Sequence, residues 1–382
     1  MLAAPEEHFT PVAGHGYLIA TLVFSAPSSG GSHSVGVYYA PNVTLSFSIN
    51  GGSGTAPPPA ITNRVGQNIV LPDTEGISPP DKYFLYGWSE KTDSGELIYA
   101  AGSHYTLHAN ATLYAVWSGD GSTANVPKLI YNRTDLEGMA NGLNLHYKLM
   151  EDIDLGNVEW TPIGPNNTNP FTGSFDGNGK KISKLKVSSN STFAGLFGYI
   201  RGDKIVVQNL HIEDVNIVGW YAGAVAGYVY TGSIQGCSVT GTQCTISGNS
   251  AGGIAGSSNS SIQNCFSTGA VSATGNNSHA SGIAGYSSSI QDCVALNSSV
   301  SGSTAQRVLG MNNNNCTLNN NYGREDMIGG PWGNASDGLD GETVAATSYN
   351  TQAWWINSAN WHNGAWDSAI WNFTDGSLPT LK

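Results

Sequence analysis

The chain has 382 residues, 49 of them glycine, with only 11% charged residues and a formal net charge of −12 at pH 7. A chain of this length predicts two or three modules, and so little charge, with long Ser-, Asn-, Thr- and Gly-rich stretches, excludes a typical helix-rich cytosolic enzyme. The acidic balance also excludes a surface that attracts nucleic acid or an anionic membrane. No stretch approaches the roughly 20 apolar residues of a membrane span.

The first segment, residues 1–42, matches no known pattern and is assigned as an N-terminal strand segment of unknown affiliation. Its apolar run Tyr17–Phe24 is the longest in the chain. The run lacks the basic flank and cleavage site of a signal peptide, so we predict a strand there.

Residues 43–118 contain short alternating strands around the turn Asn50–Gly52, which requires positive φ. One face of these strands should be buried, with Trp88 and Trp117 in or beside a small core. The segment resembles the Listeria-Bacteroides repeat in its stretches Val43–Phe47, Asn50–Gly52, Leu71-Pro72, Tyr86–Trp88 and Leu113–Trp117. The resemblance implies a small β-grasp-like module of bacterial surface proteins at 43–118. Residues 119–127 are then a flexible linker.

Residues 128–187 are predicted as the N-terminal cap and first coil of a solenoid, which needs a cover over its first coil. We expect a helix over Asp135–Ala140 and strands over Tyr147–Leu155 and Ile182–Val187. Calcium could take oxygen ligands from Asp152, Asp154 and the turn Asp176–Gly179. No bidentate acid stands at a matching spacing, so we favour a capping strand with an Asp-Gly turn and expect no cofactor.

Two interleaved repeats organise residues 188–322. The pattern Ser-Ile-Gln-x-Cys recurs every 28 residues, at 233–237, 261–265 and 289–293. A Gly-Leu-Phe-Gly-like series recurs every 29 residues and ends at Gly198, Gly227, Gly256 and Gly285. Only short strands lie between these marks, and stacked coils of such strands satisfy one another's backbone groups. The sequence therefore predicts an all-β fold, a parallel β-helix of five or six coils.

The repeats also predict columns of equivalent side chains along the solenoid. Two inward columns and one outward amide ladder are expected: Ile234, Ile262 and Ile290; Cys237, Cys265 and Cys293; and Gln235, Gln263 and Gln291. Parallel side chains one coil apart do not offer the roughly 90° torsion of a disulfide, so we expect these cysteines to act as small hydrophobes. Cys244 lies outside the column and is expected to be the exposed thiol.

Several motifs occur in order along the solenoid: Leu149–Leu155, Trp160–Gly164, Phe171–Gly179, Gly195–Gly198 and Leu378–Leu381. In these motifs, residues 131–381 resemble the GLUG-motif surface proteins. The resemblance implies a right-handed β-helix, as in bacterial adhesins and in non-catalytic regions of large secreted proteins, including some secreted peptidases. We expect the signal and anchor regions of such a surface protein to lie outside this sequence.

Many β-helices are polysaccharide lyases or glycosidases, which need paired carboxylates, or a basic group beside an acidic calcium cluster, on one exposed face. Glu213 and Asp214 are neighbours on a predicted strand and should face opposite ways. Asp292 lies about three coils away from them. Serine and histidine show no triad spacing. We therefore expect no catalytic residue.

Residues 323–382 are predicted as a Trp-rich C-terminal cap, because the last coil exposes an apolar cross-section and open strand edges. Six of the ten tryptophans fall in this segment: Trp332, Trp354, Trp355, Trp361, Trp366 and Trp371. Exposed tryptophans at this density would instead stack on sugar rings or anchor a protein. Beside the favoured capping role, the candidate ligand-binding residues are Trp332, Trp354, Trp355, Trp361 and Trp366.

The sequence thus predicts a non-catalytic adhesion or interaction module of a bacterial extracellular protein, located at the cell surface and monomeric. Its expected partner is a host or neighbouring-cell protein or glycan, bound through hydroxyl and amide ladders on the coils or through the Trp-rich end. The alternatives are a carbohydrate-active lyase or glycosidase and a purely structural stalk. Two carboxylates about 5 to 10 Å apart in an open groove would favour the enzyme.

Overall fold

The structure is a computed structural model that describes residues 41–51, 57–73, 77–92 and 98–382. The strand predicted at Tyr17–Phe24, and nearly all of the segment 1–42, lie outside the described residues. The chain divides into two compact units, Met1–Gly119 and Asp120–Lys382.

The first unit is built on a mixed five-stranded sheet. Its strands, in spatial order, are β2 (Ile61–Arg64), β1 (Asn42–Ser48), β7 (Ala111–Gly119), β4 (Tyr83–Ser89) and β5 (Ile98–Ala100). Strands β1 and β7 are parallel and the other neighbours antiparallel, while β3 (Asn68–Val70) pairs separately with β6 (His104–Thr106). Trp88 is fully buried in the core, where its indole N–H donates to the Pro72 carbonyl. The assignment of this unit to the Listeria-Bacteroides repeat stays a prediction.

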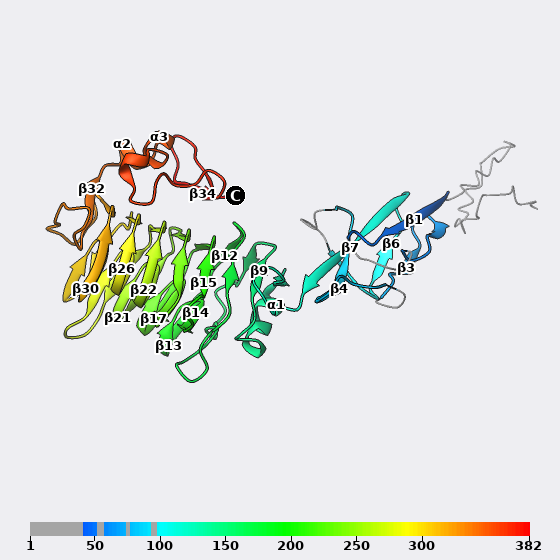
Figure 1. Cartoon of the computed structure of the whole chain (residues 1–382), viewed down its shortest axis with the longest axis horizontal. Helices are drawn as coiled ribbons and strands as arrows, with labels where there is room; N and C mark the ends of the chain where they lie inside the picture. The colour runs from blue at the N-terminus through cyan, green and yellow to red at the C-terminus, as the bar shows by residue number, and fades with distance from the viewer. Residues whose placement is uncertain (1–40, 52–56, 74–76, 93–97) are drawn as a thin grey trace, which may run out of the picture. The chain divides into compact units, whose positions relative to one another are not determined.

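The second unit is a parallel β-solenoid of about six turns, so the predicted fold class is confirmed (Figure 1). Each turn contributes to three parallel sheets. The eight-stranded sheet contains β10 (Ile153–Asp154), β12 (Lys181–Ser183), β16 (His211–Glu213), β20 (Ser238–Thr240), β23 (Phe266–Ser267), β27 (Val294–Ala295), β31 (Tyr322–Arg324) and β32 (Glu342–Val344). The seven-stranded sheet contains β13 (Lys186–Ala194), β17 (Asn216–Gly223), β21 (Thr245–Gly252), β24 (Ala270–Ala273), β25 (His279–Ser281), β28 (Val300–Ser301) and β29 (Thr304–Gln306).

The ten-stranded sheet completes the solenoid wall. It contains β8 (Lys128–Ile130), β9 (Tyr147–Leu149), β11 (Phe175–Asp176), β14 (Phe197–Ile200), β15 (Val206–Gln208), β18 (Ala226–Val229), β19 (Ser233–Gln235), β22 (Ala255–Gln263), β26 (Ala284–Gln291) and β30 (Leu309–Asn319). Helix α1 (Arg133–Gly138) and the 3-10 turn η1 (Met139–Asn141) follow β8, close to the predicted helix, and the Asn132 side chain caps α1 by accepting from the Asp135 N–H.

The predicted isoleucine column is confirmed. Ile234, Ile262 and Ile290 are paired in register on successive strands and are fully buried. The same column continues to Val207 on one side and Leu318 on the other. Burying each of these side chains contributes roughly 1.5–3 kcal/mol, so the column is a main source of cohesion between coils. In the outward ladder, Gln263 donates to Gln291 at 3.5 Å, whereas Gln235 bonds to Ser233.

The stacked cysteines are buried, and all five cysteines are free thiols. The column ends at Asn321, whose side-chain oxygen accepts from the Cys293 N–H at 3.0 Å. The prediction for Cys244 is wrong, because this residue is only 4% exposed. Gly269 of the next coil packs on the Cys244 sulfur, and burial raises the pKa of this thiol to about 11. Cys316 is the half-buried cysteine.

The strands predicted over 147–155 and 182–187 are each split by a corner of the coil. Lys184 has a φ of 56° between β12 and β13. An earlier corner of each coil, between the ten-stranded and the eight-stranded sheets, has its own left-handed series, Asn178, Asn209, Gly236, Asn264, Asp292 and Asn320, with φ between 48° and 57°. Asn and Asp tolerate this conformation better than other residues with a side chain, which explains why the corners select them.

Residues 325–341, which we call the end cap, cover the last coil. Met327 is buried in the solenoid core, and the Leu339 carbonyl accepts from the N–H groups of Val308 and Leu309. Arg307 is 1% exposed and holds this end cap. Its guanidinium donates to the carbonyls of Gly323, Arg324, Gly333, Asp340 and Gly341 and to the Thr343 hydroxyl.

Residues 345–382, which we call the C-terminal strap, lie elsewhere than the sequence predicts. The strap contains α2 (Ala346–Tyr349), α3 (Gln352–Trp355), η2 (Ser358–Asn360), β33 (Trp371–Asn372) and β34 (Thr380–Leu381). It runs back from the last coil along the flank of the solenoid (Figure 1). The Lys382 carbonyl lies against Gly179 in the first coils, so the strap covers the flank and the end cap alone covers the end. In the described ranges, no helix is long and apolar enough to cross a membrane.

Candidate functional site

The strap buries most of the predicted tryptophan site. Trp355, Trp361 and Trp366 are at most 4% exposed and pack on outward side chains of the eight-stranded sheet. That sheet presents Phe266, Val294 and Tyr322 in register, and these residues join the tryptophans in one apolar cluster. Trp371, at 2% exposed, belongs to the same cluster.

The other two predicted tryptophans are half-buried and lie in different places. Trp354 packs edge-on against Tyr322 at 4.9 Å in the strap, and Trp332 lies in the end cap, where its indole N–H donates to the Met327 carbonyl. The five predicted ligand-binding residues therefore do not form one open aromatic platform.

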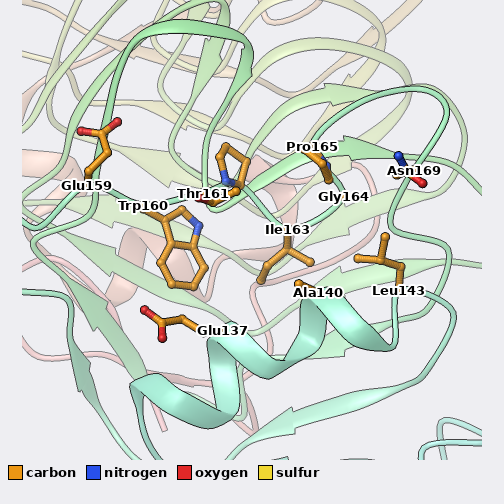
Figure 2. A pocket seen from close by; sticks show the side chains of 11 residues that line it. Glu137, Ala140, Leu143, Glu159, Trp160, Thr161, Ile163, Gly164, Pro165 and Asn169 are labelled. Carbon is orange, nitrogen blue, oxygen red and sulfur yellow. The ribbon is translucent and has the colours of Figure 1, made fainter.

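A pocket of about 420 Å³ lies instead at the N-terminal cap of the solenoid, and we call it the cap pocket. Figure 2 shows Glu137, Ala140 and Leu143 on the helical side, opposite Trp160 and Ile163. Trp160 is 3% exposed and is fixed by an indole N–H bond to the Leu196 carbonyl at 3.1 Å. The pocket therefore has a rigid apolar wall formed by the Trp-Thr-Pro-Ile-Gly segment.

Two further hollows continue from the cap pocket. The second, about 430 Å³, shares Glu159–Pro162 and Pro165 with the cap pocket and adds residues of β13. The third, about 380 Å³, shares Ser191 and Thr192 with the second and extends over β17 and β21 to Thr274, which follows β24. Together they form a continuous row of hollows along the solenoid, which we call the lateral row.

One equivalent position of three successive coils lines the third hollow. The register of β13, β17 and β21 places Thr192, Trp220 and Asn249 at this position. The adjacent position is Gly219, where a Cβ would lie 2.5 Å from the Ala194 methyl group. This close approach requires glycine, and the neighbouring Trp220 is 56% exposed.

Trp220 is not among the tryptophans predicted from the sequence as ligand-binding residues. The available signal is that Trp220 is the one tryptophan between residues 188 and 322 and follows a glycine that interrupts the strand alternation. Near it, a ring cluster lines the Gly-Leu-Phe-Gly corner: Phe193 stacks on Tyr221 at 5.6 Å, and Tyr199 on Tyr228 at 5.1 Å. These rings make the corner beside the lateral row rigid.

The two carboxylates of the cap pocket both make local interactions. Glu159 accepts from the Ser188 N–H at 2.6 Å, and hydrogen bonding with Ser188 lowers the pKa of Glu159. Glu137 pairs with Arg133 at 2.8 Å. The general acid of a glycosidase needs a raised pKa. The pKa of Glu159 is lowered instead, which does not suit that role.

The acids of the coils are tied to the wall as well. Glu213 pairs with Lys181 at 3.0 Å, and His211 bonds through both ring nitrogens to Ser238 and Thr240. Burial lowers the pKa of His211. The expectation that Glu213 and Asp214 lie on one strand is wrong, because β16 ends at Glu213 and Asp214 turns the corner with a φ of 52°.

The candidate calcium ligands make local bonds. Asp152 accepts from the Lys181 N–H, and Asp154 pairs with Lys184 at 2.6 Å. Asp176 accepts from the Asn178 N–H and from the Asn209 amide. In the part of the chain that the structure describes, no three His, Cys, Asp or Glu side chains gather as metal ligands do.

The described architecture defines the second unit as a repeat protein of the parallel β-solenoid class. Residues 218–246, which include Trp220, match the family described as "The GLUG motif". Over 170 residues the chain is 32% identical to halomucin of Haloquadratum walsbyi, a match that spans 41% of this chain and 2% of halomucin. The GLUG motif and the similarity to halomucin indicate a surface or structural protein.

A solved structure, that of a candidate immunoglobulin A1 protease from Bacteroides ovatus, shares the fold with a TM-score of 0.51. The match covers 68% of this chain and 93% of that one, at 19% sequence identity. At this identity the likeness concerns the fold alone.

Proposed function

We propose that the chain is a non-catalytic interaction module of an extracellular surface protein and that it holds a carbohydrate chain along the lateral row. The observation that carries the proposal is the column of equivalent side chains Thr192, Trp220 and Asn249, which line the third hollow on successive coils. Neighbouring coils lie about 4.8 Å apart, close to the length of one pyranose. A linear glycan along the solenoid would therefore meet one equivalent position for each sugar.

The side chains in the row suit a neutral carbohydrate. Trp220 offers an exposed indole for the C–H face of a sugar, while Thr192, Asn249 and Thr274 offer hydroxyl and amide groups for its hydroxyls. Among the described residues that line the second and third hollows, Glu159 is the one with an ionisable side chain. Weak contacts of this kind gain strength when they repeat along a polymer.

The state of the acids supports a binding function over an enzymatic one. The pKa of Glu159 is lowered, and the carboxylates of Glu137 and Glu213 are engaged in ion pairs with Arg133 and Lys181. Hydrolysis or elimination needs a free acid or base beside the bound sugar.

A glycan array with the full chain, displayed at high density, tests the proposal. Binding should occur to at least one class of polysaccharide and should be lost in Trp220→Ala, because the exposed indole supplies the stacking surface. Ile356→Ala is the matched control, since Ile356 is 43% exposed but lies in the strap. An array without hits, or hits that survive in Trp220→Ala, would refute the proposal and leave the structural stalk as the better account.

A further inference from the structure

We infer that the cap pocket is a terminal subsite that takes the end sugar of the chain and selects a pyranose without an acidic group. The inference rests on the proposed function and adds to it both a direction for the bound chain and a charge preference.

The position of the pocket indicates an end site. Glu137 of α1, Ala140 of η1 and Leu143 form the wall at the helical side, so the lateral row stops against the N-terminal cap (Figure 2). The cap pocket is also the most enclosed of the three hollows. A single sugar enters such a pocket from one side, whereas the open hollows beyond it accommodate the following residues of a chain.

The charges at the pocket indicate which sugar fits. Its ionisable lining residues are two acids, Glu137 and Glu159, and the pKa of Glu159 is lowered by Ser188, which keeps it ionised near neutral pH. A uronic or sialic acid would bring a third carboxylate into the pocket beside them, and like charges held in one pocket repel each other. A neutral hexose avoids this cost.

The polar groups suit hydroxyls. Arg133 donates to Oε1 of Glu137, and in the described ranges no bond occupies Oε2 of this carboxylate. A carboxylate with one oxygen already held in place accepts hydroxyl hydrogens with little loss of side-chain freedom. Asn169 adds an exposed amide at the rim, and the wall of Trp160 and Ile163 contacts the apolar edge of the ring.

The inference is tested by titrating the full chain with cellotriose and mannotriose, each beside its C6-oxidised uronic acid counterpart, followed by saturation-transfer NMR. The neutral trisaccharides should bind about tenfold or more tightly than the oxidised ones. Ala140→Trp fills the pocket and should lower neutral-sugar affinity by about tenfold. Ala359→Trp is the matched control, because Ala359 is also an exposed alanine in a 3-10 turn.

Glu137→Gln should narrow the preference for neutral over oxidised trisaccharides without abolishing binding, a result that a purely structural role of Glu137 would not give. Equal affinity for the neutral and oxidised trisaccharides, or unchanged affinity in Ala140→Trp, would overturn the inference. The proposed function would survive either result if array binding still depends on Trp220. Loss of that array binding as well would overturn the proposed function together with the inference.

Discussion

The buried arginine of the end cap allows a quantitative prediction. Arg307→Met keeps most of the side-chain volume and removes the guanidinium, whose five N–H groups face six oxygen acceptors, five carbonyls and one hydroxyl. At about 1.5–3 kcal/mol for each of five bonds made by a charged group, a simple sum would be about 7–15 kcal/mol. Desolvation of the guanidinium, which also lowers the pKa of Arg307, offsets much of that sum.

We therefore expect Arg307→Met to destabilise the end of the solenoid by about 3–5 kcal/mol, the usual cost of removing one partner from a buried charged network. Amide hydrogen exchange measures this directly, because the Glu342 N–H bonds to the Asn321 carbonyl across the coil that Arg307 holds. Its protection should fall by about a thousandfold.

Arg324→Met is the matched control for Arg307→Met. The guanidinium of Arg324 pairs with Asp326, whose side chain is 72% exposed, so the loss should be about 1 kcal/mol or less. Equal losses of protection in the two variants would refute the reasoning.

Three further predictions follow from the strap, the buried tyrosines and the cysteines. Asp292→Ala should loosen the strap, because the Asp292 carboxylate accepts hydrogen bonds from the N–H groups of His362 and Asn363. Tryptophan fluorescence should shift to the red. An unchanged spectrum would contradict a role of Asp292 in holding the strap. Burial raises the pKa of Tyr147 and Tyr322 to about 12, so the folded state favours the protonated phenols. The free energy of unfolding should therefore be at its full value below pH 10 and fall as the pH rises toward 12. A free energy that stays constant over that range would contradict the raised pKa values. A thiol reagent should modify the half-buried Cys316 before it modifies the buried Cys237, Cys265 and Cys293. Equally fast labelling of those three cysteines would contradict their burial in the solenoid core.

Local spacing sufficed to predict the solenoid. The 28-residue period of Ser-Ile-Gln-x-Cys repeats one structural unit, so a single inward position, such as Ile262, implies its equivalents in register. The split of the strand expected over 182–187 could not be predicted, because Lys184 adopts a left-handed conformation that lysine rarely takes. Cys244 was assigned to the surface because the contact that buries it, with Gly269, comes from the next coil.

The location of the proposed binding surface could not be predicted from the density of tryptophans in the sequence. The strap lies along the flank because one outward column changes from polar to apolar, from His211 and Ser238 to Phe266 and Val294. That change is present in the sequence, but it becomes a signal only once the register of the coils is known. The exposed Trp220 follows Gly219, whose close approach to Ala194 of the preceding coil also becomes visible only in the folded chain.

The central claim is that carbohydrate binds along the lateral row. Hydrogen exchange of the full chain, with and without the best array ligand, tests this claim most directly. The account predicts added protection in the segments 159–169, 187–193 and 218–220, which line the row. Protection confined to the strap, residues 345–382, would contradict the account and return the binding site to the Trp-rich segment.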